Sequence, residues 1–338
     1  MKKKLNLNRL YKILSAIKRT KILVIGDLIL DHYIFGDAQR LSPEAPVPVV
    51  WANREDFLLG GASNVAHNVV SLGGKSTICG VVGRDYYGQK IISLARSKDV
   101  DDKFVVVDNQ RPTTLKTRII AQHHQVVRVD WESCSVLSKK TNKKIVDMIK
   151  KNIDTFDAVI IEDYGKGVIN SQILEEVIAL CNKKNKIVTV DPKEDNFELY
   201  KNVTALTPNL REAQTVANFK MRKEEDIFIV KDIIMNELNP QALLITRGED
   251  GMSLFLKDKG EFHLPTFALE VFDVSGAGDT VIAVFSAALA CGADFIEAAS
   301  LANVAAGLSV GKLGVAAIAE WEISDRLKEI HDLYFNKL

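Results

Sequence analysis

The chain has 338 residues, of which 47% are hydrophobic, and its 44 Lys and Arg residues balance 44 Asp and Glu residues. This composition excludes a disordered protein, and the zero net charge argues against a protein that binds nucleic acid or an anionic membrane through a basic surface. No apolar stretch reaches the roughly 18 residues that a transmembrane helix needs, so no membrane span is predicted.

Four cysteines lie far apart in the sequence and include no C-x-x-C pair: Cys79, Cys134, Cys181 and Cys291. Scattered cysteines of this kind are typical of reduced core thiols rather than of a disulfide framework. We therefore expect a cytoplasmic protein.

The first predicted elements are an N-terminal helix and a buried strand. Leu10, Ile13, Leu14 and Ile17 recur at helical spacing, which predicts an amphipathic helix rather than an export signal. Residues 21–27, KILVIGD, form a short apolar run that ends in Gly and Asp. This pattern is typical of a strand buried on both faces of a parallel sheet.

Helical and strand-like segments alternate along much of the remaining chain. Predicted helices cover 62–73, 87–100 and about 171–184, another begins near Leu210, and predicted strands lie within 76–83, 157–167, 186–193, 203–209 and 242–248. This alternation indicates an α/β fold in three layers, with helices on both faces of a mostly parallel central sheet.

Two segments, 32–59 and 112–130, interrupt the alternation because they look like successive strands without an intervening helix. Pro43, Pro46 and Pro48 fit poorly in a central strand and suit a sheet edge. We expect these segments to form a small separate sheet over one end of the main sheet, where it would act as a lid, a dimer contact or both.

Polar side chains follow several predicted strands. They lie at Asp27 and Asp31, in EDYGKG at 162–167, in DPK at 191–193 and in TPNLRE at 207–212. Ligands of open α/β sheets bind beyond the carboxyl ends of the strands, so these residues together indicate a cleft. Each of them taken singly is equally well explained as a helix cap or a turn residue.

Residues 271–293, VFDVSGAGDTVIAVFSAALACGA, carry only two charged side chains, Asp273 and Asp279. Gly276 and Gly278 permit backbone geometries that bring amides close to a ligand, and the free N–H groups of a following helix attract an anion. Asp279 at the head of this helix can accept a proton from a hydroxyl while the amides stabilise a transferring phosphoryl group. The alternative is a helix residue stabilised only by the helix dipole.

Other glycine-rich runs indicate which kinds of ligand site the chain has and which it lacks. The diglycine Gly60-Gly61 and Asn64 in the following helix offer bare backbone and neutral polar groups that suit sugar hydroxyls. GGKST at 73–77 resembles the end of a P-loop, but Val69 occupies the position of that motif's first glycine. No G-x-G-x-x-G follows the first strand, which argues against a dehydrogenase.

Three motifs together resemble the ribokinase-like, or PfkB, sugar kinases: GGASN at 60–64, NLRE at 209–212 and GAGD at 276–279. The resemblance covers nearly the whole chain. It implies one kinase domain over 1–338 with a three-layer α/β/α fold, in which the lid and dimerisation strands are inserted at about 32–59 and 112–130.

The resemblance also implies roles for individual residues. Asp279 would be the catalytic base, and the amides of Gly276, Ala277 and Gly278 would form the anion hole for the γ-phosphoryl group of ATP. The remaining matched positions would hold Mg²⁺ through water (Asn209, Glu212), the sugar (Asp31, Gly60, Gly61, Asn64) and the nucleotide (Thr246, Arg247, Gly248, Gly251, Asn303).

Within this family, four runs resemble the heptose 7-phosphate kinases: RLSPEAPVPVV at 40–50, EDYGKG at 162–167, DPK at 191–193 and GKLG at 311–314. This implies ATP- and Mg²⁺-dependent phosphorylation of D-glycero-β-D-manno-heptose 7-phosphate at C1, a step of ADP-heptose synthesis for the lipopolysaccharide core. Many bacteria fuse this kinase to a nucleotidyltransferase, whereas this chain ends soon after the kinase motifs, so phosphorylation alone is expected. The alternatives are a kinase of another sugar or sugar phosphate, and a non-catalytic nucleotide- or sugar-binding protein.

The phosphate group of such a sugar requires cations. Together with Asp191, the candidates that complete the predicted substrate site are Lys116, Arg118, Lys166 and Lys193. Each of these cations taken singly also fits a solvated surface charge. The apolar run at 47–51 and the resemblance predict a homodimer through the small sheet. No nucleic-acid or membrane partner is expected.

Overall fold

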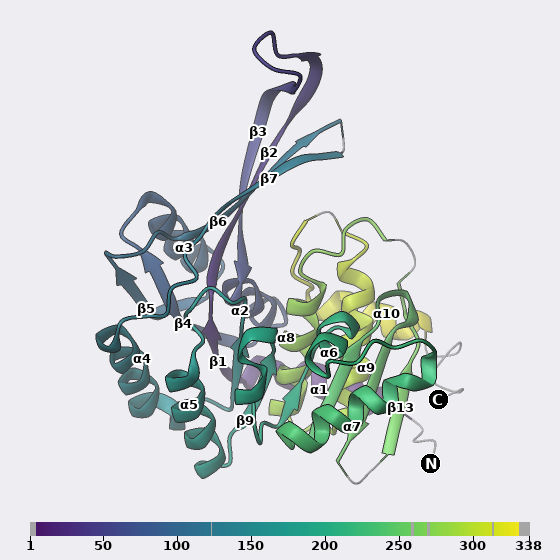
Figure 1. Cartoon of the computed structure of the whole chain (residues 1–338). Helices are drawn as coiled ribbons and strands as arrows, with labels where there is room; N and C mark the ends of the chain where they lie inside the picture. Colours follow the sequence, from purple (N-terminus) through teal and green to yellow (C-terminus); the bar gives the residue numbers. More distant parts are fainter. Residues whose placement is uncertain (1–4, 123, 258–259, 269–270, 313, 331–338) are drawn as a thin grey trace.

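The computed structural model describes residues 5–122, 124–257, 260–268, 271–312 and 314–330. A nine-stranded sheet, in the order β13-β12-β11-β10-β9-β8-β1-β4-β5, forms the centre of the main body (Figure 1). Its strands are β1 (Lys21–Gly26), β4 (Lys75–Gly83), β5 (Asp101–Asp108), β8 (Ala158–Glu162), β9 (Ile187–Asp191), β10 (Ala205–Leu206), β11 (Ala242–Thr246), β12 (Met252–Leu256) and β13 (Gly260–Leu264). The strands from β5 to β11 run parallel, and β12 and β13 are antiparallel to their neighbours.

Helices cover both faces of this sheet. They are α1 (Leu7–Ala16), α2 (Ala62–Ser71), α3 (Tyr86–Ser97), α4 (Lys139–Asn152), α5 (Ser171–Lys183), α6 (Leu210–Val216), α7 (Ile227–Leu238), α8 (Ala277–Ala290), α9 (Phe295–Ser309) and α10 (Glu320–Ile330). Ile22 and Val24 of β1 pack into the core beneath one helical layer, and Leu23 and Ile25 pack into the core beneath the other. The predicted three-layer α/β fold is therefore confirmed.

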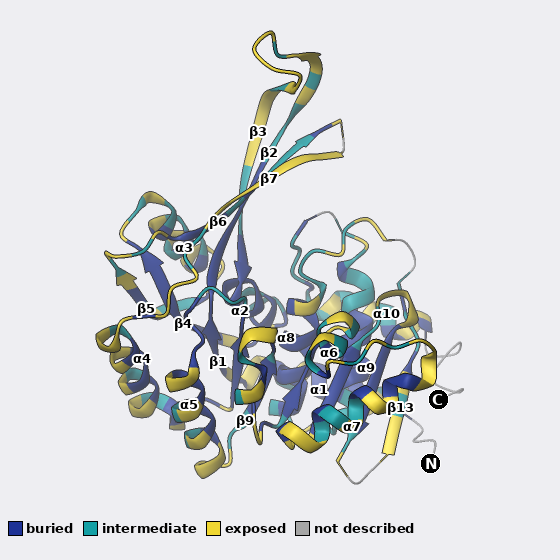
Figure 2. Ribbon diagram, in the orientation of Figure 1, coloured by how far each residue is buried: buried dark blue, intermediate teal, exposed yellow. Residues whose placement is uncertain are grey.

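A second, four-stranded sheet rises from the main body in the order β3-β2-β6-β7 (Figure 1). Its strands are β2 (Leu28–Leu41), β3 (Pro48–Gly61), β6 (Thr114–Ala121) and β7 (His124–Trp131). Pro48 begins the edge strand β3, and Pro43 and Pro46 lie in the turn before it, where no ladder hydrogen bond is lost. We call these strands the small sheet; its outer part is largely exposed (Figure 2).

The N-terminal helix was predicted correctly. Asn6 caps α1, and Leu10, Ile13 and Leu14 are buried on its inner face. Ile17 is also buried, in a 3₁₀ turn that follows the helix.

Several features of the fold differ from the sequence prediction, which did not include helices α4, α7, α9 and α10. Strands β5, β12 and β13 were not predicted as separate strands, and β2 and β3 extend beyond the expected 32–59 into the main body. Cys134 is exposed rather than in the core, whereas Cys79 and Cys181 are buried and Cys291 is half-buried. None of the helices within the described ranges is both long and apolar enough to cross a membrane.

Candidate active site

The candidate site lies at the carboxyl ends of the central strands. β1 pairs with β8 on one side and with β4 on the other, so the strand order changes direction at β1. Such a switch point opens a crevice beyond the strand ends. The head of α8 and the base of the small sheet lie near these strand ends (Figure 1).

Asp279 lies in the first turn of α8, and only 3% of the residue is exposed. Asn64 Nδ2 donates to its Oδ2 at 2.6 Å, and the Tyr164 hydroxyl donates to its Oδ1 at 2.9 Å. Burial raises the pKa of Asp279 to about 6, and these two hydrogen bonds limit the rise. The carboxylate is thus ionised at neutral pH and held in a fixed orientation, as a proton acceptor requires.

The backbone before Asp279 is shaped for close approach. Gly276 caps α8 in the left-handed region with φ of 77°, and a Cβ there would lie 2.9 Å from Cγ1 of Val315. Within the described part of the chain, the amides of Gly278 and Asp279 receive no hydrogen-bond acceptor. The helix therefore presents free N–H groups and its positive dipole end at the crevice.

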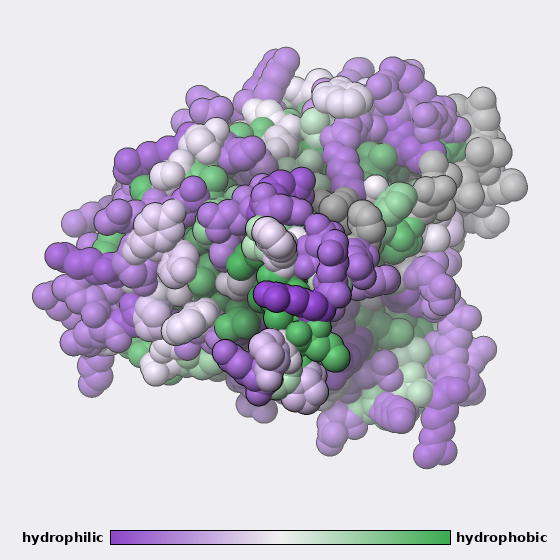
Figure 3. Space-filling model, turned by 90° about the horizontal axis from the view of Figure 1, so that it is seen from above, coloured by the Kyte–Doolittle hydropathy of each residue, from purple (hydrophilic) through white to green (hydrophobic). Residues whose placement is uncertain are grey.

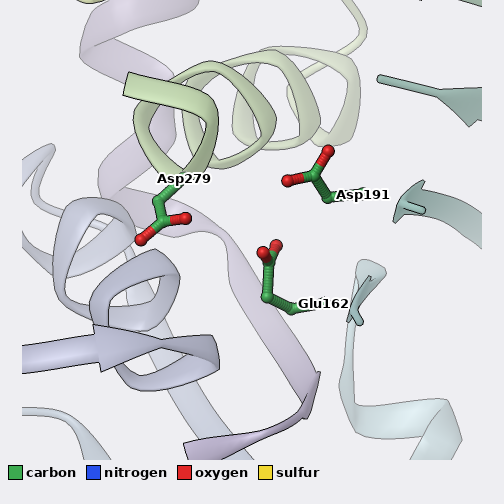
Figure 4. A group of neighbouring side chains, drawn as sticks. All are labelled: Glu162, Asp191 and Asp279. Atoms are coloured by element: carbon green, nitrogen blue, oxygen red, sulfur yellow. The ribbon is translucent and has the colours of Figure 1, made fainter. Parts of the chain in front are cut away.

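Three carboxylates converge beside this helix terminus. One oxygen each of Glu162, Asp191 and Asp279 lies within 4.8 Å of the others, and the three side chains point toward one another from β8, β9 and α8 (Figure 4). Burial raises the pKa of Glu162 well above its usual value, and the charges of Asp191 and Asp279 raise it further. Burial also raises the pKa of Asp191 well above its usual value, and the charges of Glu212 and Asp279 raise it further.

The donor set of this cluster fits a magnesium ion. Both oxygens of Glu162 are buried without a hydrogen-bond partner among the described residues, whereas Asp191 Oδ1 accepts a bond from Thr207 at 3.1 Å. Uncompensated buried carboxylates are costly, and oxygen ligands are those that Mg²⁺ prefers. Because both oxygens of Asp279 already receive hydrogen bonds, Glu162 and Asp191 are the better-suited ligands.

The residues predicted to bind the sugar lie around Asp279. A Cβ at Gly60 would lie 2.2 Å from Asp31 Oδ2, so only glycine lets this carboxylate approach the backbone, and Gly61 has φ of 55°, which also favours glycine. Asp31 is buried and forms an ion pair with Arg118. The structure therefore brings Asp31, Gly60 and Asn64 close to Asp279.

The four predicted cations differ in their partners. Arg118 pairs with Asp31, Lys166 Nζ lies 2.7 Å from Glu132, and Lys193 Nζ lies 3.9 Å from Glu212. Lys116 has no carboxylate at ion-pair distance within the described ranges, and its Nζ lies 5.4 Å from the centre of the Tyr164 ring. Burial lowers the pKa of Lys116, and the charge of Lys166 lowers it further.

A cavity of about 600 Å³ extends from the head of α8 toward β11, β12 and α9. Ala277 and Gly278 line one end of it, and apolar side chains such as Met252 and Val281 line its walls. Four of the residues predicted for the nucleotide line it as well: Thr246, Gly248, Gly251 and Asn303. An apolar cavity that reaches free helix amides suits a nucleotide, with its nucleobase between the apolar walls and its phosphates at the amides.

Arg247 differs from the prediction that placed it with the nucleotide. Its side chain turns to the other side of the β11–β12 turn, where it lies 2.9 Å from Glu224 and donates to Ser253. There it lines a separate hollow of about 230 Å³. Thr246, the last residue of β11, therefore faces the large cavity, whereas Arg247 does not.

Asn209 and Glu212, which were predicted to hold Mg²⁺, cap the N-terminus of α6. Asn209 Oδ1 accepts from the Glu212 amide at 2.9 Å, and Glu212 Oε2 accepts from the Asn209 amide at 3.0 Å. Contact with the metal through water stays a prediction for both residues.

The sequence prediction gave no individual role to Glu162 or Tyr164. Their only signal in the sequence was their position in EDYGKG after a buried strand.

Comparison with known proteins agrees with this geometry. Residues 19–322 match the model of the pfkB family of carbohydrate kinases. The chain belongs to this family and is a sugar kinase.

Curated relatives share the name bifunctional protein HldE. The protein from Geotalea uraniireducens is 44% identical over 93% of this chain and 64% of its own length. The protein from Wolinella succinogenes is 40% identical over 94% of this chain and 67% of its own length. The chain thus spans about two thirds of the length of these relatives.

Solved structures share the fold. Ribokinase from Arabidopsis thaliana, complexed with ribose and ATP, matches with a TM-score of 0.73 and 20% identity over 91% of this chain and 99% of that one. Phosphofructokinase-2 from Escherichia coli matches with a TM-score of 0.75 and 15% identity over 92% of this chain and 99% of that one.

Proposed function

We propose that this sugar kinase transfers the γ-phosphoryl group of ATP to the C1 hydroxyl of D-glycero-β-D-manno-heptose 7-phosphate, yielding the 1,7-bisphosphate. The observation that carries the proposal is Asp279, a buried and doubly hydrogen-bonded carboxylate beside free helix amides at the end of a large cavity. The heptose is favoured by the four sequence runs that resemble heptose 7-phosphate kinases.

In the proposed reaction, the oxygen of the sugar hydroxyl attacks the γ-phosphorus while Asp279 accepts the hydroxyl proton. The bond between that phosphorus and the bridging oxygen of ATP breaks, and ADP leaves. The free amides at the head of α8 stabilise the negative charge of the transferring group, and Asn64 keeps the base oriented. Glu162 and Asp191 would hold Mg²⁺, which neutralises charge on the ATP phosphates. No phosphoenzyme forms, because base and phosphoryl acceptor act in one displacement.

The ammonium of Lys116, which has no carboxylate partner among the described residues, supports a phosphorylated sugar as the acceptor. A cation without a carboxylate partner can gain a charge-assisted bond from an incoming phosphate without first breaking an ion pair. Lys166, although paired with Glu132, lies close enough to lower the pKa of Lys116, whose ammonium lies next to the ring of Tyr164.

Replacing Lys116 with Met is expected to raise KM for the sugar phosphate by about 10-fold or more, the scale of one charge-assisted hydrogen bond. KM for ATP should change less than 2- to 3-fold, and steady-state kinetics with each substrate varied in turn measures both. Lys150→Met, which removes an exposed ion pair with Glu176, is the matched control. Equal rises in both KM values would contradict the assignment.

A coupled ADP-release assay across sugar monophosphates tests the substrate. We expect D-glycero-β-D-manno-heptose 7-phosphate to give the highest kcat/KM, with fructose and other hexose phosphates well below it. A higher kcat/KM for another sugar would replace the heptose while leaving the kinase chemistry intact.

We further propose that the chain forms a homodimer through the small sheet. Trp51 of β3 is 81% exposed and Trp131 of β7 is 63% exposed; Leu41 and Val127 of the same sheet are also exposed, as is Val47 in the turn between β2 and β3. Seen from above, hydrophobic side chains gather near the centre of the molecule among hydrophilic ones (Figure 3). Large apolar side chains exposed on one sheet favour burial against a second copy.

Trp51→Glu is expected to weaken this dimer at least about 10-fold, because a large buried aromatic is replaced by a charge. Light scattering at micromolar concentration should then report a monomer for the variant and a dimer for the wild type. Trp321 of α10 is 64% exposed and lies outside the small sheet, so Trp321→Glu is the matched control. A monomeric wild type would refute the proposed dimer.

A further inference from the structure

Tyr164 contacts both the proposed base and the unpaired cation of the small sheet. Its hydroxyl donates to Asp279 Oδ1 at 2.9 Å, and the Lys116 ammonium lies 5.4 Å from the centre of its ring. Asp279 belongs to α8 of the main body, whereas Lys116 belongs to β6. One side chain therefore links the two parts of the site.

The loop that carries Tyr164 is anchored by backbone hydrogen bonds to a buried carboxylate. Asp27, which is 1% exposed, accepts hydrogen bonds from the amides of Tyr164, Lys166 and Val168 at 3.0, 3.0 and 3.1 Å. Gly167 adopts φ of 83°, where a Cβ would lie 2.3 Å from the Ser135 carbonyl oxygen. The loop is thus fixed before any substrate arrives.

The hydroxyl of Tyr164 completes the restraint on the base. Asn64 holds Oδ2 of Asp279, so the carboxylate could still rotate if Oδ1 had no donor. With both oxygens held, the plane of the carboxylate is set, and each oxygen keeps a lone pair for the substrate hydroxyl. A rotated carboxylate would misdirect that lone pair, and misplacement at the reacting group lowers the rate steeply.

We propose that Tyr164 is a positioning residue of the phosphoryl transfer, which orients Asp279 through its hydroxyl and seats Lys116 on its ring. This inference rests on the proposed function, since it assigns Asp279 as the base. The two contacts use different parts of the side chain, and variants can remove them one at a time.

Tyr164→Phe removes the hydroxyl and keeps the ring. Its kcat is expected to fall about 10-fold, the scale of one hydrogen bond to a charged group, with both KM values unchanged. Tyr164→Leu removes the ring as well, so it should show the same fall in kcat and in addition a rise of about 3-fold or more in KM for the sugar phosphate. A kcat for Tyr164→Phe within 2-fold of the wild type would overturn the inference.

A double-mutant cycle separates positioning from simple packing. If the hydroxyl acts through Asp279, adding Tyr164→Phe to Asp279→Asn should lower kcat no further. Additive losses would show that Tyr164 acts independently of the base. Thermal unfolding within a few degrees of the wild type confirms that each variant is folded.

A second readout needs no sugar and no turnover. In protein labelled with ¹³C at Cζ of tyrosine, the Tyr164 resonance is assigned by its absence from Tyr164→Phe and should move in Asp279→Asn. An unmoved resonance overturns the inference even if no sugar phosphate is turned over. Lack of turnover with every sugar phosphate, together with a moved resonance, would instead remove the proposed function alone.

Discussion

Asp279→Asn is expected to lower kcat by about 10²- to 10⁴-fold, the usual contribution of a positioned general base. The amide cannot accept a proton at neutral pH, but it has the size of the carboxylate. Its oxygen can still accept from Asn64, and its NH₂ can donate to the Tyr164 hydroxyl. The fold and both KM values should therefore be close to those of the wild type, as steady-state kinetics and thermal unfolding will measure.

Asp102→Asn is the matched control for this change. Asp102 forms an ion pair with Arg96 on α3 and lies outside the crevice, so its replacement should leave kcat within 2-fold of the wild type. Retention of more than a tenth of wild-type kcat in Asp279→Asn would show that another group accepts the proton.

Glu162→Gln is expected to have opposite effects on stability with and without Mg²⁺. In the absence of metal, the change removes the charge of a buried carboxylate that has no hydrogen-bond partner among the described residues and is crowded by two others, so it should raise the free energy of unfolding. In the presence of Mg²⁺, the wild type should gain stability through binding, whereas the variant should bind the ion at least about 10-fold more weakly. Thermal unfolding with a series of MgCl₂ concentrations measures both effects.

The control for this experiment is Glu176→Gln, which removes an exposed carboxylate paired with Lys150. It should leave the Mg²⁺-dependent gain unchanged. A Glu162→Gln variant that is less stable than the wild type without metal, and that gains as much stability from Mg²⁺, would refute a magnesium site at this cluster.

The layers of the fold could be predicted from the sequence because the inner strands are mostly short apolar runs and several helices, such as α1, have a periodic apolar face. Residues Ile22 to Ile25 of β1 illustrate this, because alternate side chains pack into the two cores on opposite faces of the sheet. Strands β12 and β13 escaped prediction because they form an antiparallel edge added after the regular alternation. Whether these residues pair as strands depends on their packing in the folded protein, which the local sequence does not specify.

The helix head and the diglycine of the site could also be predicted, because glycine next to a polar side chain at a helix start is a local signal. The carboxylate cluster could not. Glu162 and Asp191 are 29 positions apart in the chain, and only the parallel register of β8 with β9 places them opposite each other. The outward turn of Arg247 was missed for a similar reason, because its partner Glu224 comes from a distant turn.

The most direct test of the account is the position of the phosphate in the product formed from ATP, Mg²⁺ and D-glycero-β-D-manno-heptose 7-phosphate. Phosphorus NMR of the wild-type reaction should show a second phosphate ester coupled to the anomeric proton, and the Asp279→Asn reaction should lack it. A product phosphorylated at any other carbon, or equal product from both proteins, would contradict Asp279 as the base that activates the C1 hydroxyl.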